Sequence, residues 1–142
     1  MSVETDKLLA EKLMGWPKLA IGQMEPIEGY WDRGSYIEVR RLRGDSHRWS
    51  PSTNFAHTHE VIEQALTYGV MIESVCRSRE YQCSIQPQRR DGSVVLVSGI
   101  YGDPCTAACD ALTMLIDWMN DRERNRDVKV EKRRRHRTPK RR

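Results

Sequence analysis

The fold of this chain is decided by residues 47–66, HRWSPSTNFAHTHEVIEQAL. Pro51 is followed by three residues of types that commonly cap helix N-termini, Ser52, Thr53 and Asn54. Beyond them, four side chains recur at steps of four, three and four residues, the spacing of one helix face: Phe55, His59, Ile62 and Leu66. The stretch therefore predicts a helix that begins near residue 52, packs inward through this face and ends at Gly69.

Within this stretch, residues 57–60 carry two histidines and a glutamate, His57, His59 and Glu60, which raises the question of a metal or acid–base site. His57 and His59 are two residues apart, so a helix places them about 200° apart around its axis and they cannot face one ion. A zinc-protease pair needs histidines four residues apart, with a glutamate beside the first. We therefore predict that His59 is a packed or cap-adjacent residue rather than a metal ligand, and that His57 and Glu60 face solvent.

Other metal and catalytic signals are missing from the sequence. The four cysteines do not form the closely spaced pairs of a zinc site: Cys76 and Cys83 are seven residues apart, and Cys105 and Cys109 are four apart on one expected helix. No serine-hydrolase elbow, P-loop or dinucleotide-binding motif occurs. We expect reduced thiols, no metal site, no cofactor and no catalytic residues, and therefore a protein that is not an enzyme.

Working outward from residues 47–66, the chain predicts further elements on both sides. Residues 5–13 have helical spacing, with Thr5 or Asp6 as the cap and Gly15 at the end. Residues 35–42 alternate as in a strand, and residues 17–34 and 43–51 read as connections. Residues 70–77, 81–87 and 93–101 are predicted strands, with a tight turn at residues 90–92 between the last two.

A last helix is predicted from Asp103 and Pro104, which suit a helix start. Its expected inner face is Ala108, Leu112, Leu115 and Met119, widened by Ala111 and Ile116. The order α-β-α-β-β-β-α predicts a single-domain α+β helix–sheet–helix sandwich with a mainly antiparallel sheet. The apolar run at residues 94–97, VVLV, predicts a strand that is buried on both faces.

The net charge of +4 hides a division of the chain. Residues 129–142 hold nine Lys/Arg and one Glu, a net charge of +8, whereas the remaining 128 residues have a net charge of −4. We predict a folded domain over residues 1–127 and a disordered basic tail over residues 128–142. The alternatives for the tail are a solubility or low-affinity segment with no specific partner and a segment that neutralises phosphates. The cations that suit phosphate neutralisation are Lys132, Arg133, Arg134, Arg135, Arg137, Lys140, Arg141 and Arg142.

A second group of basic residues lies near aromatic residues in the folded domain. Arginine beside tyrosine or tryptophan suits an anionic ring-containing ligand, through phosphate contacts and stacking, and it suits a protein interface equally well. The alternative is a solvated strand face. The candidate residues for a ligand or partner are Tyr36, Arg40, Arg41, Arg43, Arg48, Trp49, Arg89 and Arg90.

Two short motifs carry a resemblance to a known family. EKLMGW at residues 11–16, followed by WSPSTNFAHTHEVIEQAL at residues 49–66, resembles small phage proteins with the phage ABA-sandwich domain. The resemblance covers roughly residues 5–119, and TAACDALTML at residues 106–115 is similar to the family's closing helix. The arginine-rich strand and the basic tail depart from the family pattern. The resemblance implies a phage or prophage origin and a helix–sheet–helix fold, and it supplies no catalytic residues.

These features lead to two functional hypotheses. The first is a non-catalytic phage accessory protein, a host-defence antagonist that caps a host protein or sequesters an anionic, nucleotide-type small molecule. The second is a nucleic-acid-binding accessory protein that uses the basic tail. The chain has neither a membrane-spanning apolar run nor a signal-peptide pattern, so we expect it in the cytoplasm of an infected bacterial host. A homo-oligomer is compatible with both hypotheses.

Overall fold

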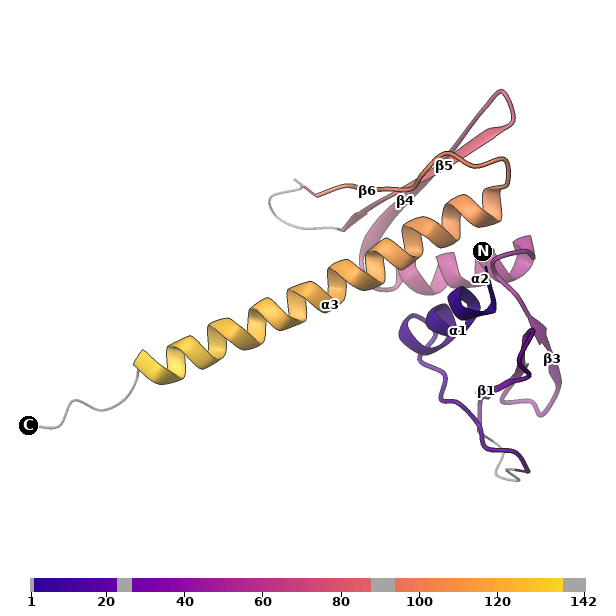
Figure 1. Cartoon of the computed structure of the whole chain (residues 1–142), viewed down its shortest axis with the longest axis horizontal. Helices are drawn as coiled ribbons and strands as arrows, with labels where there is room; N and C mark the ends of the chain where they lie inside the picture. The colour runs from indigo at the N-terminus through magenta and orange to yellow at the C-terminus, as the bar shows by residue number, and fades with distance from the viewer. Residues whose placement is uncertain (1, 23–26, 88–93, 137–142) are drawn as a thin grey trace, which may run out of the picture.

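The computed structural model describes residues 2–22, 27–87 and 94–136, with side chains as far as Arg124. Over these residues the chain forms an α+β fold of three helices and two three-stranded antiparallel sheets (Figure 1), so the predicted fold class is confirmed. The elements in chain order are α1 (Val3–Lys12), β1 (Gly29–Asp32), β2 (Ile37–Arg40), β3 (Ser46–Trp49), α2 (Phe55–Leu66), β4 (Val70–Arg77), β5 (Glu80–Pro87), β6 (Leu96–Val97) and α3 (Pro104–His136).

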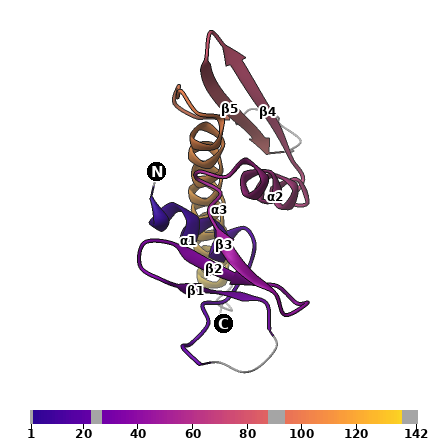
Figure 2. The same ribbon diagram turned by 90° about the vertical axis from the view of Figure 1, so that its right-hand side faces the viewer.

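The two sheets lie at opposite ends of the body, with α1 and α2 between them (Figure 2). One sheet has the strand order β1-β2-β3 and the other β4-β5-β6. Helix α3 runs past both α1 and α2 and packs against β5 with its N-terminal half. The body is therefore built around the first half of α3.

The hydrophobic core follows the inner face of α3. Its predicted members Ala108, Leu112 and Leu115 are buried, together with Ala111 and Ile116, whereas Met119 is only partly buried. These side chains lie in one cluster with residues of α1, β2, α2 and β5: Leu9, Leu13, Ile37, Val39, Val61, Ala65, Cys83 and Ile85. Ala107, Ala108 and Ala111 of α3 are small, so the helices and strands that surround α3 can pack closely against it.

The β1–β3 sheet corrects the prediction, which had only one strand in this part of the chain. Strands β1 and β3 lie in segments predicted to be connections, and they flank β2 in antiparallel register, with Tyr30 opposite Val39 and Trp49 opposite Ile37. A turn closed by the hydrogen bond from Gly44 N–H to Arg41 O joins β2 to β3. Unlike residues 35–42, the residues of β1 and β3 show no alternation of polar and apolar side chains, which explains the miss.

Helix α1 begins earlier than predicted, at Val3 with Ser2 in the cap position, so neither Thr5 nor Asp6 is its cap. Asp6 is buried, and its carboxylate accepts a hydrogen bond of 3.0 Å from Ser52 N–H. Burial raises the pKa of Asp6, and the hydrogen bonds from Ser52 and Ser50 oppose that shift. Asp6 therefore fastens α1 to the segment that starts α2.

Helix α2 has the predicted position but a different inner face. Asn54 caps it by accepting hydrogen bonds from the N–H groups of Ala56 and His57, and Gly69 follows it at φ 78°. Phe55 is 64% exposed and Leu66 47%, whereas the buried residues are Thr58, Val61 and Ala65. The Thr58 hydroxyl is satisfied in the interior by Pro51 O and Asn54 O, so a threonine can face the core where the pattern placed Phe55.

The last strand is shorter and more exposed than predicted. Strands β4 and β5 match residues 70–77 and 81–87 closely, but β6 covers only Leu96 and Val97. Val95 is 52% exposed and Val97 43%, so the prediction of burial on both faces is wrong. Among the described residues, α3 covers the face of β5 that carries Cys83 and Ile85, and the alternate residues of β5 are less buried. The predicted turn at residues 90–92 lies outside the described residues.

Helix α3 corrects the predicted boundary of the basic tail. It starts at Pro104 with the Asp103 carboxylate accepting from Thr106 N–H, as expected of a helix cap. It then continues without a break to His136, so residues 128–136 are helical where a disordered tail was predicted. Lys, Arg and Glu are good helix formers, and extending an existing helix is far easier than starting one. Residues 137–142 lie outside the described residues.

Candidate functional site

The arginines of the β1–β3 sheet each lie against an aromatic ring of the protein itself. The Arg48 guanidinium is 5.0 Å from the centroid of the Tyr36 ring, and that of Arg40 is 5.1 Å from the Trp31 ring. Arg40 also donates a 3.0 Å hydrogen bond from Nε to Ile27 O. Of the predicted binding residues, Tyr36 and Arg48 are therefore brought together, whereas Arg40 contacts Trp31, which was not predicted.

Arg41 joins the β1–β3 sheet to helix α2. Its guanidinium donates two hydrogen bonds to the Glu60 carboxylate, of 2.6 and 2.8 Å, and lies 5.0 Å from the centroid of the Trp16 ring. Burial acts to raise the pKa of Glu60, but the hydrogen bonds from Arg41 and Trp49 outweigh it and lower the pKa of this carboxyl overall. The pair is thus held in its charged form. We call Arg41, Glu60, Trp49 and His57 the junction.

Trp49 is the buried centre of the junction. Its ring is fully buried, packs edge-on against Trp16 with the ring centroids 4.9 Å apart, and donates from Nε1 to Glu60 at 2.9 Å. The prediction placed Trp49 at a ligand site, but a fully buried ring offers no face for stacking. Its position explains instead how the end of β3 is fixed to α2.

The three polar residues of the opening motif occupy positions opposite to those predicted. His59 is on the surface, where it pairs with Glu63 at 3.1 Å. His57 and Glu60 are half-buried and face the β1–β3 sheet. The helix is rotated relative to the predicted phase, because Thr58 and Val61 rather than Phe55 and His59 fill the core.

The two histidines of this region have hydrogen bonds that fix their tautomers. His57 Nδ1 accepts from Ser50 N–H at 2.9 Å, so its proton resides on Nε2. His47 Nε2 accepts from Arg41 Nε at 3.1 Å, so its Nδ1 carries the proton and donates to Arg48 O at 3.0 Å. Burial and the positive charge of its neighbours lower the pKa of His57 against the opposing effect of Glu60. The His57 ring is therefore built into the structure as a neutral group.

A hollow of about 520 Å³ opens beside the junction. Two guanidinium groups and three carboxylates line it, so a phosphorylated ligand would meet more negative than positive side chains. Its lining residues are Glu28, Arg41, Leu42, Arg43, Asp45, His47, Ala56, His57 and Glu60. Of the predicted ligand residues, only Arg41 and Arg43 reach this hollow, and Arg89 and Arg90 lie outside the described residues.

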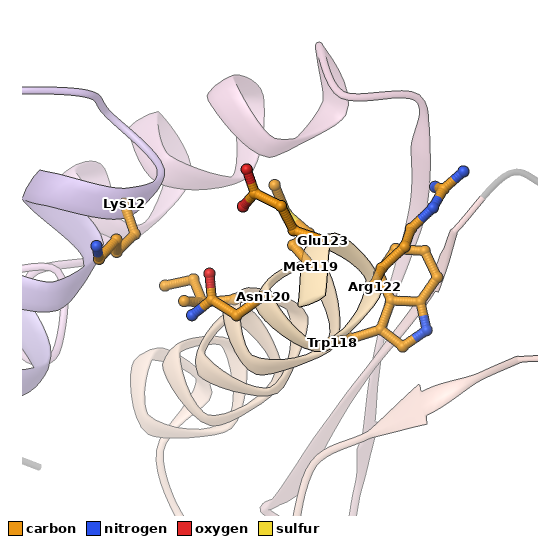
Figure 3. A pocket seen from close by; sticks show the side chains of 7 residues that line it. Lys12, Trp118, Met119, Asn120, Arg122 and Glu123 are labelled. Atoms are coloured by element: carbon orange, nitrogen blue, oxygen red, sulfur yellow. The ribbon is translucent and has the colours of Figure 1, made fainter. Parts of the chain in front are cut away.

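A second hollow, of about 550 Å³, lies where α3 leaves the body (Figure 3). Lys12 of α1 lies on one side of it, and Trp118 with Arg122 lies on the other. The Arg122 guanidinium is 5.5 Å from the centroid of the Trp118 ring. Sequence reasoning missed this pair, although a tryptophan and an arginine four residues apart on a predicted helix are a usable signal.

Beyond this hollow, α3 projects away from the body (Figure 1). We call residues 121–136 the basic arm. It contains eight Lys/Arg and four Asp/Glu, and at 1.5 Å per residue it is about 24 Å long. Four of the predicted nucleic-acid-binding residues, Lys132, Arg133, Arg134 and Arg135, are on the arm, whereas Arg137, Lys140, Arg141 and Arg142 lie outside the described residues.

The part of the chain that the structure describes contains no group of three or more His, Cys, Asp or Glu side chains placed to hold a metal ion. The four cysteines are free thiols, of which Cys76 is exposed and the other three are buried. No helix in the described ranges is both long and apolar enough to cross a membrane.

Comparison with known proteins identified no relative of this chain. No family model matches the chain, and neither a curated protein nor a solved structure is significantly similar to it. The function is therefore inferred from the geometry of the chain itself.

Proposed function

We propose that the protein binds nucleic acid through the basic arm, by contacts to phosphates that do not depend on base sequence. The observation that carries the proposal is that α3 continues to His136, which places the cationic residues on a helix that extends beyond the body. Helical presentation fixes the spacing of the charges, so fewer degrees of freedom are lost on binding than with a disordered tail. Phosphate contacts of this kind supply non-specific affinity.

The charge distribution supports the same proposal. Residues 1–103 have a net charge of −2, because they hold twelve Lys/Arg and fourteen Asp/Glu, whereas residues 104–142 have a net charge of +6. Lys12 of the body and Arg122 of the arm line the same hollow where the arm joins the body. A polyanion is therefore attracted to residues 104–142 and repelled by the rest of the chain.

The first hypothesis, a phage protein that antagonises a host defence, stays a prediction. Its support was the set of arginines and aromatics on the first sheet. Of these arginines, Arg40 and Arg48 stack on the protein's own rings and Arg41 pairs with Glu60, and Trp49 is buried. The geometry of the basic arm therefore favours the nucleic-acid hypothesis.

The proposal is tested by titrating a fluorescent DNA duplex with the full chain at several salt concentrations and following anisotropy. Engagement of about six phosphates predicts a slope near −5 for log affinity against log salt concentration. Replacing Lys132, Arg133, Arg134 and Arg135 by Gln should make the slope shallower by about 3 to 4, because each lost phosphate contact contributes about 0.9. Glutamine keeps the helix propensity of the replaced residues, so the arm should remain helical.

A matched control removes four cations from the surface of the body. Lys18, Arg43, Arg48 and Arg79 are exposed and lie outside α3, and changing them to Gln should leave the salt slope almost unchanged. Equal losses in the two variants would refute the arm as the binding element. A scrambled duplex should bind like the original, because the arm is proposed to contact phosphates only.

A further inference from the structure

Strand β4 forms an open edge of the second sheet. It is eight residues long, its sheet has the order β4-β5-β6, and no other described strand pairs with its outer side. From Glu73 to Arg77 every residue is exposed. The β4–β5 hairpin projects past the start of α3 (Figure 1). A long edge strand without a cover is a ready template for pairing with another strand.

The backbone groups that face this edge can be identified from the pairing on the other side of β5. Tyr81 exchanges backbone hydrogen bonds with Tyr101, and Ser98 N–H donates to Cys83 O, so Tyr81 and Cys83 direct their backbone groups away from β4. The residues between and beside them, such as Gln82, therefore bond to β4, where Gln82 is opposite Val75. The backbone groups of successive residues in a strand point to opposite sides, so the N–H and C=O groups of Ser74 and Cys76 point toward the open edge.

The side chains of β4 complement themselves in one antiparallel register. Glu73, Val75 and Arg77 alternate along the face of the sheet that α3 does not cover. Pairing centred on Val75 sets Glu73 of each copy opposite Arg77 of the other, and Val75 opposite its own counterpart. Centring on Ser74 sets Glu73 opposite Val75, and centring on Glu73 sets two glutamates opposite each other. Opposite charges directly across a strand pair are favourable and like charges are unfavourable.

The same face supplies apolar surface around these charges. Met71 is 55% exposed and Val75 38%, and Val97, opposite Ser84 in the neighbouring pair, is 43% exposed. All three lie on the uncovered face by strand alternation. A second copy would therefore find both a free hydrogen-bonding edge and partly apolar neighbours.

We propose that two copies of the chain pair through β4, antiparallel and centred on Val75, to form one continuous six-stranded sheet. The pairing is isologous, since each copy offers the same edge. It does not depend on the proposed nucleic-acid binding, because the basic arm takes no part in it. A single strand pair buries little area, so we expect the dimer to dissociate on dilution.

The test measures mass by light scattering across a concentration series of the full chain, with reductant present to exclude disulfides through Cys76. The expected mass rises toward twice 16.6 kDa. Glu73→Arg and Arg77→Glu should each weaken dimerisation by about tenfold or more, because each places like charges opposite one another twice. The double variant Glu73→Arg/Arg77→Glu should restore dimerisation, since the charges are only exchanged.

Two further variants separate edge pairing from a general loss of folding. Ser74→Pro removes an N–H that faces the open edge, so it should abolish the dimer while leaving the β4–β5 ladder and the circular dichroism spectrum intact, whereas Ser74→Ala should dimerise normally. In a Cys76→Ser background, Val75→Cys should form an intermolecular disulfide on oxidation. Opposite residues of a pair without mutual hydrogen bonds have Cα atoms about 4.5 Å apart, within the range that a disulfide spans.

The proposal fails if the protein stays monomeric up to its solubility limit. It fails equally if a dimer forms whose affinity is indifferent to Ser74→Pro, because a surface other than the edge would then be responsible. Failure of the charge exchange to restore dimerisation would overturn the register centred on Val75.

Discussion

The two sheets of this protein are of equal strand number but are attached to the helices by different forces. The β4–β6 sheet lies on α3 through apolar side chains of β5, with Cys83 and Ile85 fully in the core. The β1–β3 sheet shares the core through Ile37 and Val39, but its last strand is fixed to α2 by the junction, where an ion pair and a buried indole meet.

This difference predicts how each attachment responds to its surroundings. Apolar burial does not depend on protonation, so the contact of β5 with α3 should be insensitive to pH. The junction contains a histidine held neutral and a charged pair, so its contribution should change with pH.

Shortening a buried side chain in the contact between β5 and α3 should cause the largest loss in the free energy of unfolding. Ile85 is fully buried, so Ile85→Ala should lower the free energy of unfolding by about 2–5 kcal/mol in denaturant titrations. Val95→Ala, a smaller truncation at a residue that precedes β6 and is 52% exposed, should cost less than about 1 kcal/mol. The loss in the Ile85 variant should be equal at pH 7.5 and pH 5.5, and a loss that varied with pH would contradict the comparison.

Removal of charge at the junction should have an intermediate effect. Glu60→Gln leaves the half-buried Arg41 guanidinium without its counter-charge, and we expect a loss of about 1–3 kcal/mol. Glu63→Gln provides a matched control on the same helix, because its partner His59 is 59% exposed and exposed pairs contribute little. If both variants lost the same amount, the junction would be no more than a surface contact.

The smallest effect concerns the pH dependence due to His57. Its pKa is lowered in the folded protein from an ordinary value of 6.5, so the unfolded chain takes up the proton at a higher pH than the folded chain. The free energy of unfolding should therefore fall as the pH decreases through 6.5 toward the lowered pKa, and the loss is complete below it. His57→Asn does not titrate and offers an oxygen to Ser50 N–H, so its stability should depend less on pH over this window. An unchanged pH profile would exclude His57 as a source.

The longer elements of the fold could be predicted from the sequence because they carry a clear period or a clear boundary. Strands β4 and β5 and the start of α3 at Pro104 match the prediction closely, and Asn54 and Gly69 bound α2 as expected. The four-residue strands β1 and β3 could not be predicted, because their pairing is set by partners elsewhere in the sheet.

The candidate site was less accessible to sequence reasoning. The rotation of α2 depends on whether Thr58 or Phe55 fills the core. Thr58 fills it, because its hydroxyl is hydrogen-bonded there, although the hydrophobic pattern of the sequence favoured Phe55. Composition located the cationic residues near the C-terminus, but whether they would be helical depended on the continuation of α3. Arg41 and Trp49 were recognised as unusual, and only the fold showed that they contact Glu60 rather than a ligand.

The length of α3 has a consequence for how the molecule moves in solution. A helix of 33 residues extends for about 50 Å, whereas a compact chain of this size has a radius of gyration of about 14–15 Å. A body with such a projecting rod experiences more friction than a sphere of equal mass, so it diffuses and sediments more slowly. On a gel-filtration column a monomer would elute early, at the volume of a heavier compact protein, and elution volume alone would mimic self-association.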